Sequence, residues 1–415
     1  MKKLFSLVLA VAMVLSMACF ASAEENTTLT IVAWDVGTTP YYQAQKEAFE
    51  ATHPGVTIEY VDVASQDWDT KAGTMLSGGD TSDLFMVKQN INIMNWAQQG
   101  FAEPLTDYIA KDNYDLSGFV GMEPNYALDG TQYALPFRSD FWVLFYNKTL
   151  FDAAGVAYPT NDMTWEEYAA LAKEMTGKGN CKYGCHYHTW RSAASLFSIL
   201  DGKNTIIDGK YDFMKPTYDM VIAQQKDGIC MDYGYLKTSS LHYSAAFENQ
   251  QCAMVNMGSW FISTLEAYMK DAETKFNWGI VKYPHPAGAE AGSTLGTVTS
   301  LAINADSPKA EAAADFINWC VSEEGAQAIA KTGTFPACGS AATAEIIKST
   351  EGFPEDSNSV DALTTSNVYL EMPYTQYASD IETILNAEHD AIMTMSETVD
   401  EGIQNMNDQV PAVLG

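Results

Sequence analysis

A strand, a helix and a second strand follow one another near the N-terminus, and this order constrains the fold more than any other feature. Residues 29–34 (LTIVAW) are apolar and typical of a buried strand. A Thr-Pro step at residues 39–40 starts a helical pattern that continues through Ala51 and ends at residues 53–55 (HPG). Residues 56–60 then alternate in polarity as a second strand. A β-α-β unit of this kind predicts a parallel sheet with crossover helices.

Strands and helices continue to alternate along most of the chain. Buried strands are expected at residues 83–87 and 295–304. Residues 164–167 (TWEE) form a capping box that predicts a helix start, and Ser307-Pro308 predicts another. After about residue 345 the pattern is mostly helical. The predicted fold class is α/β, and a length of 415 residues suits two or three domains.

The first residues have the pattern of an export signal. Residues 1–3 (MKK) are basic, residues 4–18 are almost entirely apolar, and residues 21–23 (ASA) form a cleavage site. Cleavage there makes residues 1–23 a signal peptide. In the alternative interpretation, Cys19 is the lipidated cysteine of a lipoprotein. In both cases we expect an exported protein, located at the cell surface, in the periplasm or in the medium, with contact to a membrane only through a lipid anchor or a membrane partner.

Composition excludes several classes of function. The chain has 53 Asp and Glu against 23 Lys and Arg, a formal charge of −30. This charge repels polyanions, so we expect neither nucleic acid nor an anionic membrane surface as a direct partner. A hydrophobic fraction of 47% with 12% aromatic residues excludes a disordered chain.

Cysteine and histidine residues offer two further interpretations. In an exported protein Cys181 and Cys185 are close enough in sequence to close a small disulfide loop, whereas Cys320 lies in an apolar helical pattern and is expected as a buried thiol. The cysteines with His186 and His188 match no usual zinc spacing, so no metal and no other cofactor is expected. The chain has no G-x-S-x-G elbow, P-loop or G-x-G-x-x-G motif after its first strand, and no enzyme activity is expected.

A series of short segments, taken together, resembles the family 1 extracellular solute-binding proteins, the sugar-binding components of bacterial ABC importers. The segments span about three-quarters of the chain, and Ser82 departs from the family, which usually has Pro there. In order, they are 28–34 (TLTIVAW), 53–56 (HPGV), 82–85 (SDLF), 130–136 (GTQYALP), 146–151 (YNKTLF) with 154–155, 164–167 (TWEE), 253–254 with 258–260 (GSW), 302–304 (AIN) with 307–308, and Gly333 with Pro336.

The resemblance implies a two-lobe fold of the type II periplasmic-binding-protein class, with a ligand cleft between lobes that are joined by short crossovers. It places residues 28–136 and 300–338 in an N-terminal lobe, and residues 137–299 and 339–415 in a C-terminal lobe. It implies a receptor that captures a sugar or oligosaccharide by hinge closure and delivers it to the permease subunits of an ABC transporter. The alternatives are a binding protein for a peptide or acidic solute, and an exported glycosidase or metal-dependent hydrolase.

Candidate ligand-binding residues follow from what sugars require. A sugar ring stacks on aromatic faces, its hydroxyls need directed polar groups, and open α/β sheets bind ligands at the carboxyl ends of strands. By resemblance, Trp260 stacks on the sugar and Asp140 binds hydroxyls. Arg138 and Arg191 are the only arginines; facing the cleft they would suit an acidic sugar, and otherwise they form salt bridges. The candidates are Trp34, Asp35, Lys88, Asn90, Arg138, Asp140, Trp142, His188, Trp190 and Trp260.

Overall fold

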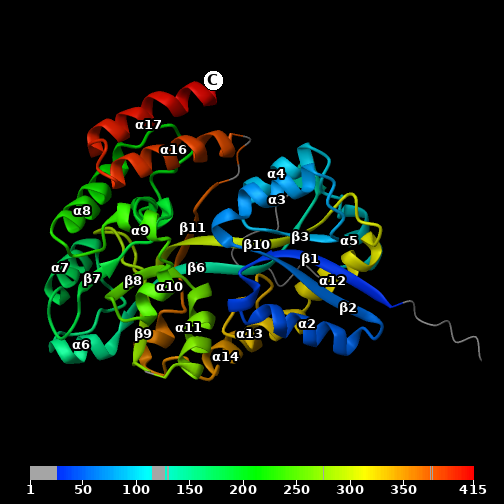
Figure 1. Ribbon diagram of the computed structural model, residues 1–415, viewed down its shortest axis with the longest axis horizontal. Helices are drawn as coiled ribbons and strands as arrows, with labels where there is room; N and C mark the ends of the chain where they lie inside the picture. Colours follow the sequence, from blue (N-terminus) through cyan, green and yellow to red (C-terminus); the bar gives the residue numbers. More distant parts are fainter. Residues whose placement is uncertain (1–25, 115–126, 129, 274, 374, 376) are drawn as a thin grey trace, which may run out of the picture.

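A mixed β-sheet runs through both halves of the molecule (Figure 1). The computed structural model describes residues 26–114, 127–128, 130–273, 275–373, 375 and 377–415. Within these residues the sheet has nine strands in the order β2-β1-β3-β10-β6-β8-β7, with β9 paired to β6 and β11 paired to β10. The fold is the predicted two-lobe α/β fold, in which helices cover each half of the sheet (Figure 1).

The N-terminal lobe contains the predicted β-α-β unit. Strand β1 (Thr27–Trp34) pairs in parallel with β2 (Val56–Val63), and α2 (Tyr41–Thr52) connects them. Strand β3 (Leu84–Val87) pairs with the other edge of β1. Helices α12 (Ala310–Val321) and α13 (Glu323–Ala330) contribute apolar faces to the same core. Helix α12 begins two residues after the predicted Ser-Pro start, because the hydroxyl of Ser307 first accepts the backbone N–H of Lys309 in a turn.

Two long strands connect the lobes. Residues 135–141 of β6 (Leu135–Asn147) pair with β10 (Ser293–Ile303), whereas residues 142–147 pair with β8 (Cys252–Gly258) and β9 (Trp278–Lys282). The segment after α13 also lies at this crossing, where the N–H of Ser139 donates to the carbonyl of Phe335. The lobes are thus joined by paired backbone and not by a flexible linker.

A buried ion pair lies on β6 at this crossing. Nε of Arg138 and Oδ2 of Asp140 are 2.9 Å apart, without the alignment of a hydrogen bond. Arg138 Nη2 donates to Thr299 Oγ1 of β10 (2.8 Å), and Ser259 Oγ of the C-terminal lobe donates to Asp140 Oδ1 (2.9 Å). Burial raises the pKa of Asp140, and the charge of Arg138 and the Ser259 hydroxyl oppose this shift. The pair therefore links both lobes through groups that are almost fully enclosed.

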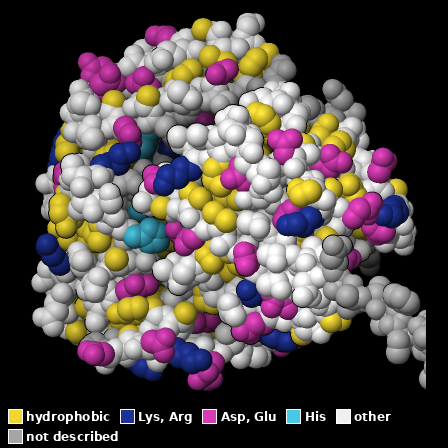
Figure 2. Space-filling view, turned by 45° about the vertical axis from the view of Figure 1, so that its right-hand side comes forward, with side chains coloured by type: hydrophobic (Ala, Val, Ile, Leu, Met, Phe, Trp, Pro, Cys, Tyr) yellow, Lys and Arg dark blue, Asp and Glu magenta, His cyan; other side chains and the backbone are white. Residues whose placement is uncertain are grey.

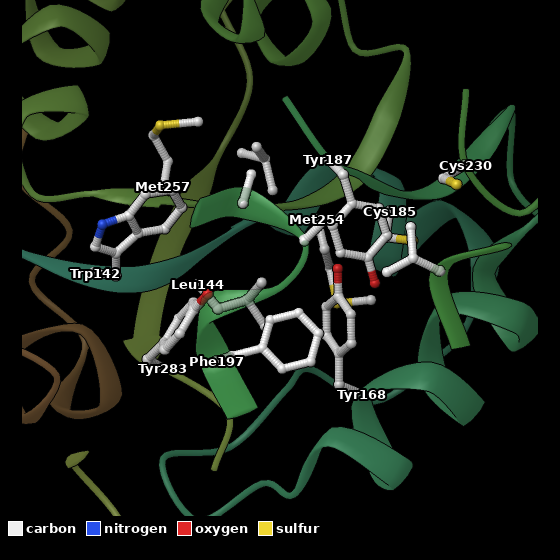
Figure 3. Packing of buried hydrophobic residues seen from close by; sticks show 14 of the residues in the cluster. Trp142, Leu144, Tyr168, Cys185, Tyr187, Phe197, Cys230, Met254, Met257 and Tyr283 are labelled. Carbon is white, nitrogen blue, oxygen red and sulfur yellow. The ribbon is translucent and has the colours of Figure 1, made fainter. Parts of the chain in front are cut away.

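The C-terminal lobe has a core rich in aromatic rings (Figure 3). The capping box is confirmed: Thr164 accepts the N–H of Glu167 at the start of α7 (Trp165–Met175). Trp165 stacks on Phe197 with a centroid distance of 3.8 Å. Helices α8 (Lys215–Lys226), α16 (Ala378–Met393) and α17 (Val399–Leu414) close the outer side of this lobe.

The remaining elements are shorter. They are α3 (Trp68–Ser77), α4 (Asn90–Gln98), α5 (Thr106–Asp112), β4 (Ala127–Leu128), β5 (Thr131–Gln132), α6 (Lys148–Ala154), β7 (Tyr183–His186), α9 (Tyr233–Ser239), α10 (Tyr243–Glu248), α11 (Trp260–Asp271), α14 (Ala341–Lys348), α15 (Ser357–Asp361) and β11 (Asn367–Leu370). Across the described part of the chain, every helix is too short or too polar to cross a bilayer.

Buried apolar residues form a separate core in each half. One large cluster draws on residues between 29 and 137 and between 298 and 329, and the other on residues between 142 and 295 and between 353 and 410. The exact lobe limits expected from the sequence stay a prediction. The expected signal peptide and Cys19 lie outside the described residues.

One sequence-based interpretation is wrong. Cys181 and Cys185 do not form a disulfide: both are buried thiols, and each donates to its own acceptor, the carbonyl of Tyr183 and Oε1 of Gln224. The chain after residue 345 is mostly helical, as expected, and β11 adds one short parallel strand to β10. Cys320 is a buried thiol, as expected.

We expect Asp140→Asn to destabilise the protein by about 3 kcal/mol, because it leaves the buried Arg138 without its counter-charge. Chemical denaturation measures the loss. Asp35→Asn is the matched control, since Asp35 is partly exposed and its Oδ1 accepts the Ser65 N–H, which an amide oxygen also does. Equal stability of the two variants would contradict a structural role of the pair.

Candidate functional site

A cavity of about 510 Å³ lies between the two lobes. Its walls come from the ends of β1 and β3, from the crossing strands β6 and β10, from the start of α11, and from β11 and α16. Figure 2 shows the hollow between the two halves of the surface, with histidine and basic side chains around it. The cavity is thus built at strand ends and crossings, where the sequence predicted a ligand site.

The structure brings together most of the predicted residues. The cavity wall includes Trp34, Asp35, Lys88, Arg138, Trp142, Trp190 and Trp260. Asp140 and His188 lie behind this wall: Asp140 is enclosed in the ion pair with Arg138, and His188 packs edge-on to Trp190 at 4.5 Å. Asn90 begins α4, but its side chain lies outside the described residues.

The N-terminal lobe contributes one ring and several charges. Trp34 ends β1 and packs edge-on against Trp68, with a centroid distance of 4.9 Å. Asp35 follows in the left-handed region (φ 51°), and its Oδ1 accepts the N–H of Ser65. Lys88 donates to the carbonyl of Ser65 (2.7 Å). Burial lowers the pKa of Lys88, and nearby Asp69 and Asp35 oppose this shift. This wall is therefore polar and held by local hydrogen bonds.

The C-terminal lobe contributes a group of aromatic rings. The centroid of Trp260 lies 5.8 Å from that of Trp142 and 6.1 Å from that of Trp190. Trp260 Nε1 donates to the hydroxyl of Tyr243 (3.1 Å), which fixes the ring. Such a wall offers apolar faces and edges to a ring-shaped ligand.

Gly258 explains the G-S-W segment in physical terms. A Cβ on Gly258 would lie 2.0 Å from the ring of Trp260, so that any side chain there would displace the indole. Ser259 supplies the hydroxyl that binds Asp140, and Trp260 begins α11. Of these three consecutive residues, Gly258 leaves room for the indole, Ser259 holds Asp140 behind the wall, and Trp260 places its ring in the cavity.

Arg191, the second arginine, also faces the cavity but is held by protein groups. Its Nη2 donates to Oε2 of Glu382 (2.8 Å) and its Nε donates to Oδ1 of Asn386 (3.1 Å). Both partners come from α16, which is nearly 200 residues away in sequence. Both arginines form salt bridges to carboxylates of the protein, which was one of the two alternatives expected from the sequence.

Several wall residues were not predicted from the sequence. Glu371 directly follows β11, Glu382, Asn386 and Asp390 come from α16, and His242 and Tyr243 lie at the start of α10. Burial raises the pKa of Glu371 to about 7, although the indole N–H of Trp142 donates to its Oε1 and opposes this shift. The sequence signals these residues only weakly, because the C-terminal segment has a helical pattern without any motif.

Metal binding has no support in the described part of the chain, where no group of three or more His, Cys, Asp or Glu side chains is arranged to hold a metal ion. His186 is fully enclosed and burial lowers its pKa to about 4, which keeps the ring neutral. Aromatic rings and hydrogen-bonding side chains line the cavity, and this arrangement suits reversible binding of a ligand.

Comparison with known proteins places the fold in a family. A sugar transporter from Rhizobium etli, solved in an open conformation, is 43% identical with a TM-score of 0.75, covering 93% of this chain and 99% of that chain. A protein of Brucella abortus named as a binding protein is 33% identical over 177 residues, which are 41% of this chain and only 40% of its own length.

A more distant relative has a phosphorylated ligand in its name. The sn-glycerol-3-phosphate-binding periplasmic protein of Yersinia pestis is 24% identical over 322 residues, which are 71% of each chain. The family model described as bacterial extracellular solute-binding protein matches residues 35–327. Because this match covers most of the chain, the protein belongs to the bacterial extracellular solute-binding protein family.

Proposed function

We propose that this protein is the extracytoplasmic receptor of an ABC importer and that it captures a sugar or oligosaccharide. The observation that carries this proposal is the cavity between the lobes, which joins a wall of tryptophan rings in one lobe to polar side chains in the other. The similarity to a protein that is named as a sugar transporter supports the same class of ligand. No catalytic step belongs to this role.

The proposed mechanism is closure of the lobes around the ligand. A ligand that contacts Trp34 in one lobe and Trp260 in the other gains more contacts when the lobes approach, and therefore favours the closed state. The crossing strands β6 and β10 are the axis of this motion, because they belong to both halves of the sheet. A permease that recognises the closed state would then receive only loaded receptors.

An acidic solute is the second candidate. It is favoured by the name of the Yersinia relative and by Arg138 and Arg191 on the cavity wall. Both guanidinium groups already have carboxylate partners, however, so a phosphate would have to compete with Asp140 and Glu382 for them. A sugar needs no such exchange.

We expect a neutral or amino sugar to raise the melting temperature when it is added in excess, because binding to the native state alone stabilises it. A thermal-shift screen should cover neutral, amino and acidic mono- and oligosaccharides, glycerol 3-phosphate and short peptides. Shifts with phosphate or peptide ligands, and none with any sugar, would replace the carbohydrate proposal with the acidic-solute or peptide alternative.

Trp260→Ala should weaken sugar binding about tenfold or more, because it removes a stacking face from the cavity. Gly258→Ala should weaken binding in the same direction, since the added Cβ displaces that ring. Isothermal titration calorimetry measures both, with Gly73→Ala as the control because no atom lies within 4 Å of its added Cβ. Unchanged affinity in both cavity variants would remove Trp260 from the ligand site.

Export is part of the proposal, and the mature N-terminus tests it. We expect a chain that begins at Glu24 after cleavage, whereas lipidation would leave a modified Cys19 and hold the protein at the membrane. Mass spectrometry of the protein from the native producer distinguishes the two. An intact chain that begins at Met1 in the cytoplasm would contradict export.

A further inference from the structure

Glu371 occupies a fixed place on the cavity wall. Its backbone N–H donates to the carbonyl of Gly296 on β10, and its Oε1 accepts the indole N–H of Trp142. Both contacts are made to strands that cross between the lobes. The carboxyl group is therefore held in the cavity by the framework itself and not by a mobile loop.

Every cation on the cavity wall already has a protein acceptor. Lys88 donates to a backbone carbonyl, and Lys237 pairs with Asp390 (3.0 Å). Arg138 pairs with Asp140, and Arg191 pairs with Glu382. Three of these four cations are paired with carboxylates, and an anionic ligand would have to compete with those carboxylates or with the Ser65 carbonyl for a hydrogen bond.

Among the described residues, three carboxylates of the wall form no ion pair with a Lys or Arg side chain. Glu371 has no ion pair with any Lys or Arg in the described residues, and the same holds for Asp35 and Asp69. Lys88, whose acceptor is a neutral carbonyl, lies near Asp35 and Asp69. The charged groups near Glu371 are Arg191, which is committed to Glu382, and the carboxylates Glu382 and Asp140 themselves. Glu371 is therefore a carboxyl group without a counter-charge of its own.

We propose that the ligand is a sugar with a protonated amino group, and that this group binds the carboxylate of Glu371. The inference rests on the proposed receptor function and makes its ligand class more specific. An ammonium group supplies the missing counter-charge and up to three hydrogen-bond donors to the Glu371 carboxylate. The neighbouring Trp142 and Trp260 rings add aromatic surface that favours a cation.

The electrostatics of the site and of the whole protein favour the same ligand. The raised pKa of Glu371, about 7, is what a buried carboxyl group without a counter-charge shows. A bound ammonium group lowers this pKa again, so that binding at about pH 6 expels the proton that Glu371 carries there. The formal charge of −30 attracts cations to the protein over a longer range.

The test compares matched ligands in the intact mature protein. Glucosamine, glucose and glucuronic acid, each as monomer and as β-1,4-linked oligomer, are titrated at about pH 6 by calorimetry. We expect the amino sugar to bind at least about tenfold more tightly than the neutral sugar of equal length, and the uronic acid to bind most weakly. Titration in buffers of different ionisation enthalpy should show a proton released with the amino sugar.

Glu371→Gln should abolish both the preference for the amine and the proton release, while the neutral sugar still binds. Glu248→Gln is the matched control, because burial also raises the pKa of Glu248 to about 7 and it does not line the cavity. If Glu371→Gln does not fold, the wild-type protein decides: added salt should weaken amine binding and leave neutral binding nearly unchanged.

Neutral sugars that bind as tightly as amino sugars would overturn this inference and leave the receptor function intact. A preference for the amine that survives in Glu371→Gln would overturn the role of Glu371. Tight binding of the uronic acid would contradict the argument from the charges of the cavity wall and the argument from the net charge of the protein. If no sugar of any charge binds, the proposed function fails as well.

Discussion

The buried pair of Arg138 and Asp140 is the interaction on which the two-lobe structure depends. It lies on β6 at the point where this strand leaves one lobe and enters the other, and its hydrogen bonds reach Thr299 on β10 and Ser259 at the start of α11. Charges in such a place are costly unless they are paired, so the arrangement is stable only when all of these groups are correctly placed. The pair therefore fixes the relative position of strands that form the base of the cavity.

The two sides of the cavity have different roles in the proposed binding of a sugar. The C-terminal lobe presents rings held by packing, such as Trp260 with its hydrogen bond to Tyr243, and the N-terminal lobe presents Trp34 beside polar groups. The wall cations have protein acceptors, and we propose that the carboxylates and rings select the ligand. The acidity of the whole chain has a local counterpart at Glu371, the carboxyl group that we propose binds the amine of the ligand.

Local sequence patterns predicted the main strands and helices of the fold. They did not predict contacts between residues that are far apart in the sequence. The β-α-β unit and the capping box at Thr164 depend on neighbours in sequence, so they could be recognised. The partners of Arg191 could not, because Glu382 and Asn386 reach it only after α16 has packed on the C-terminal lobe. Glu371 was missed for the same reason, since four residues of β11 give no periodic signal before they pair with β10. Asp140 was placed at the cavity by resemblance, and its burial behind Arg138 depends on the crossing strands.

Closure of the lobes around a sugar is the central claim, and small-angle X-ray scattering tests it most directly. The radius of gyration of the mature protein is measured without ligand and with saturating amounts of a sugar that raises its melting temperature. Lobes that close on the ligand predict a smaller radius of gyration, with the same saturation concentration as binding. A radius that stays constant at full occupancy would contradict closure.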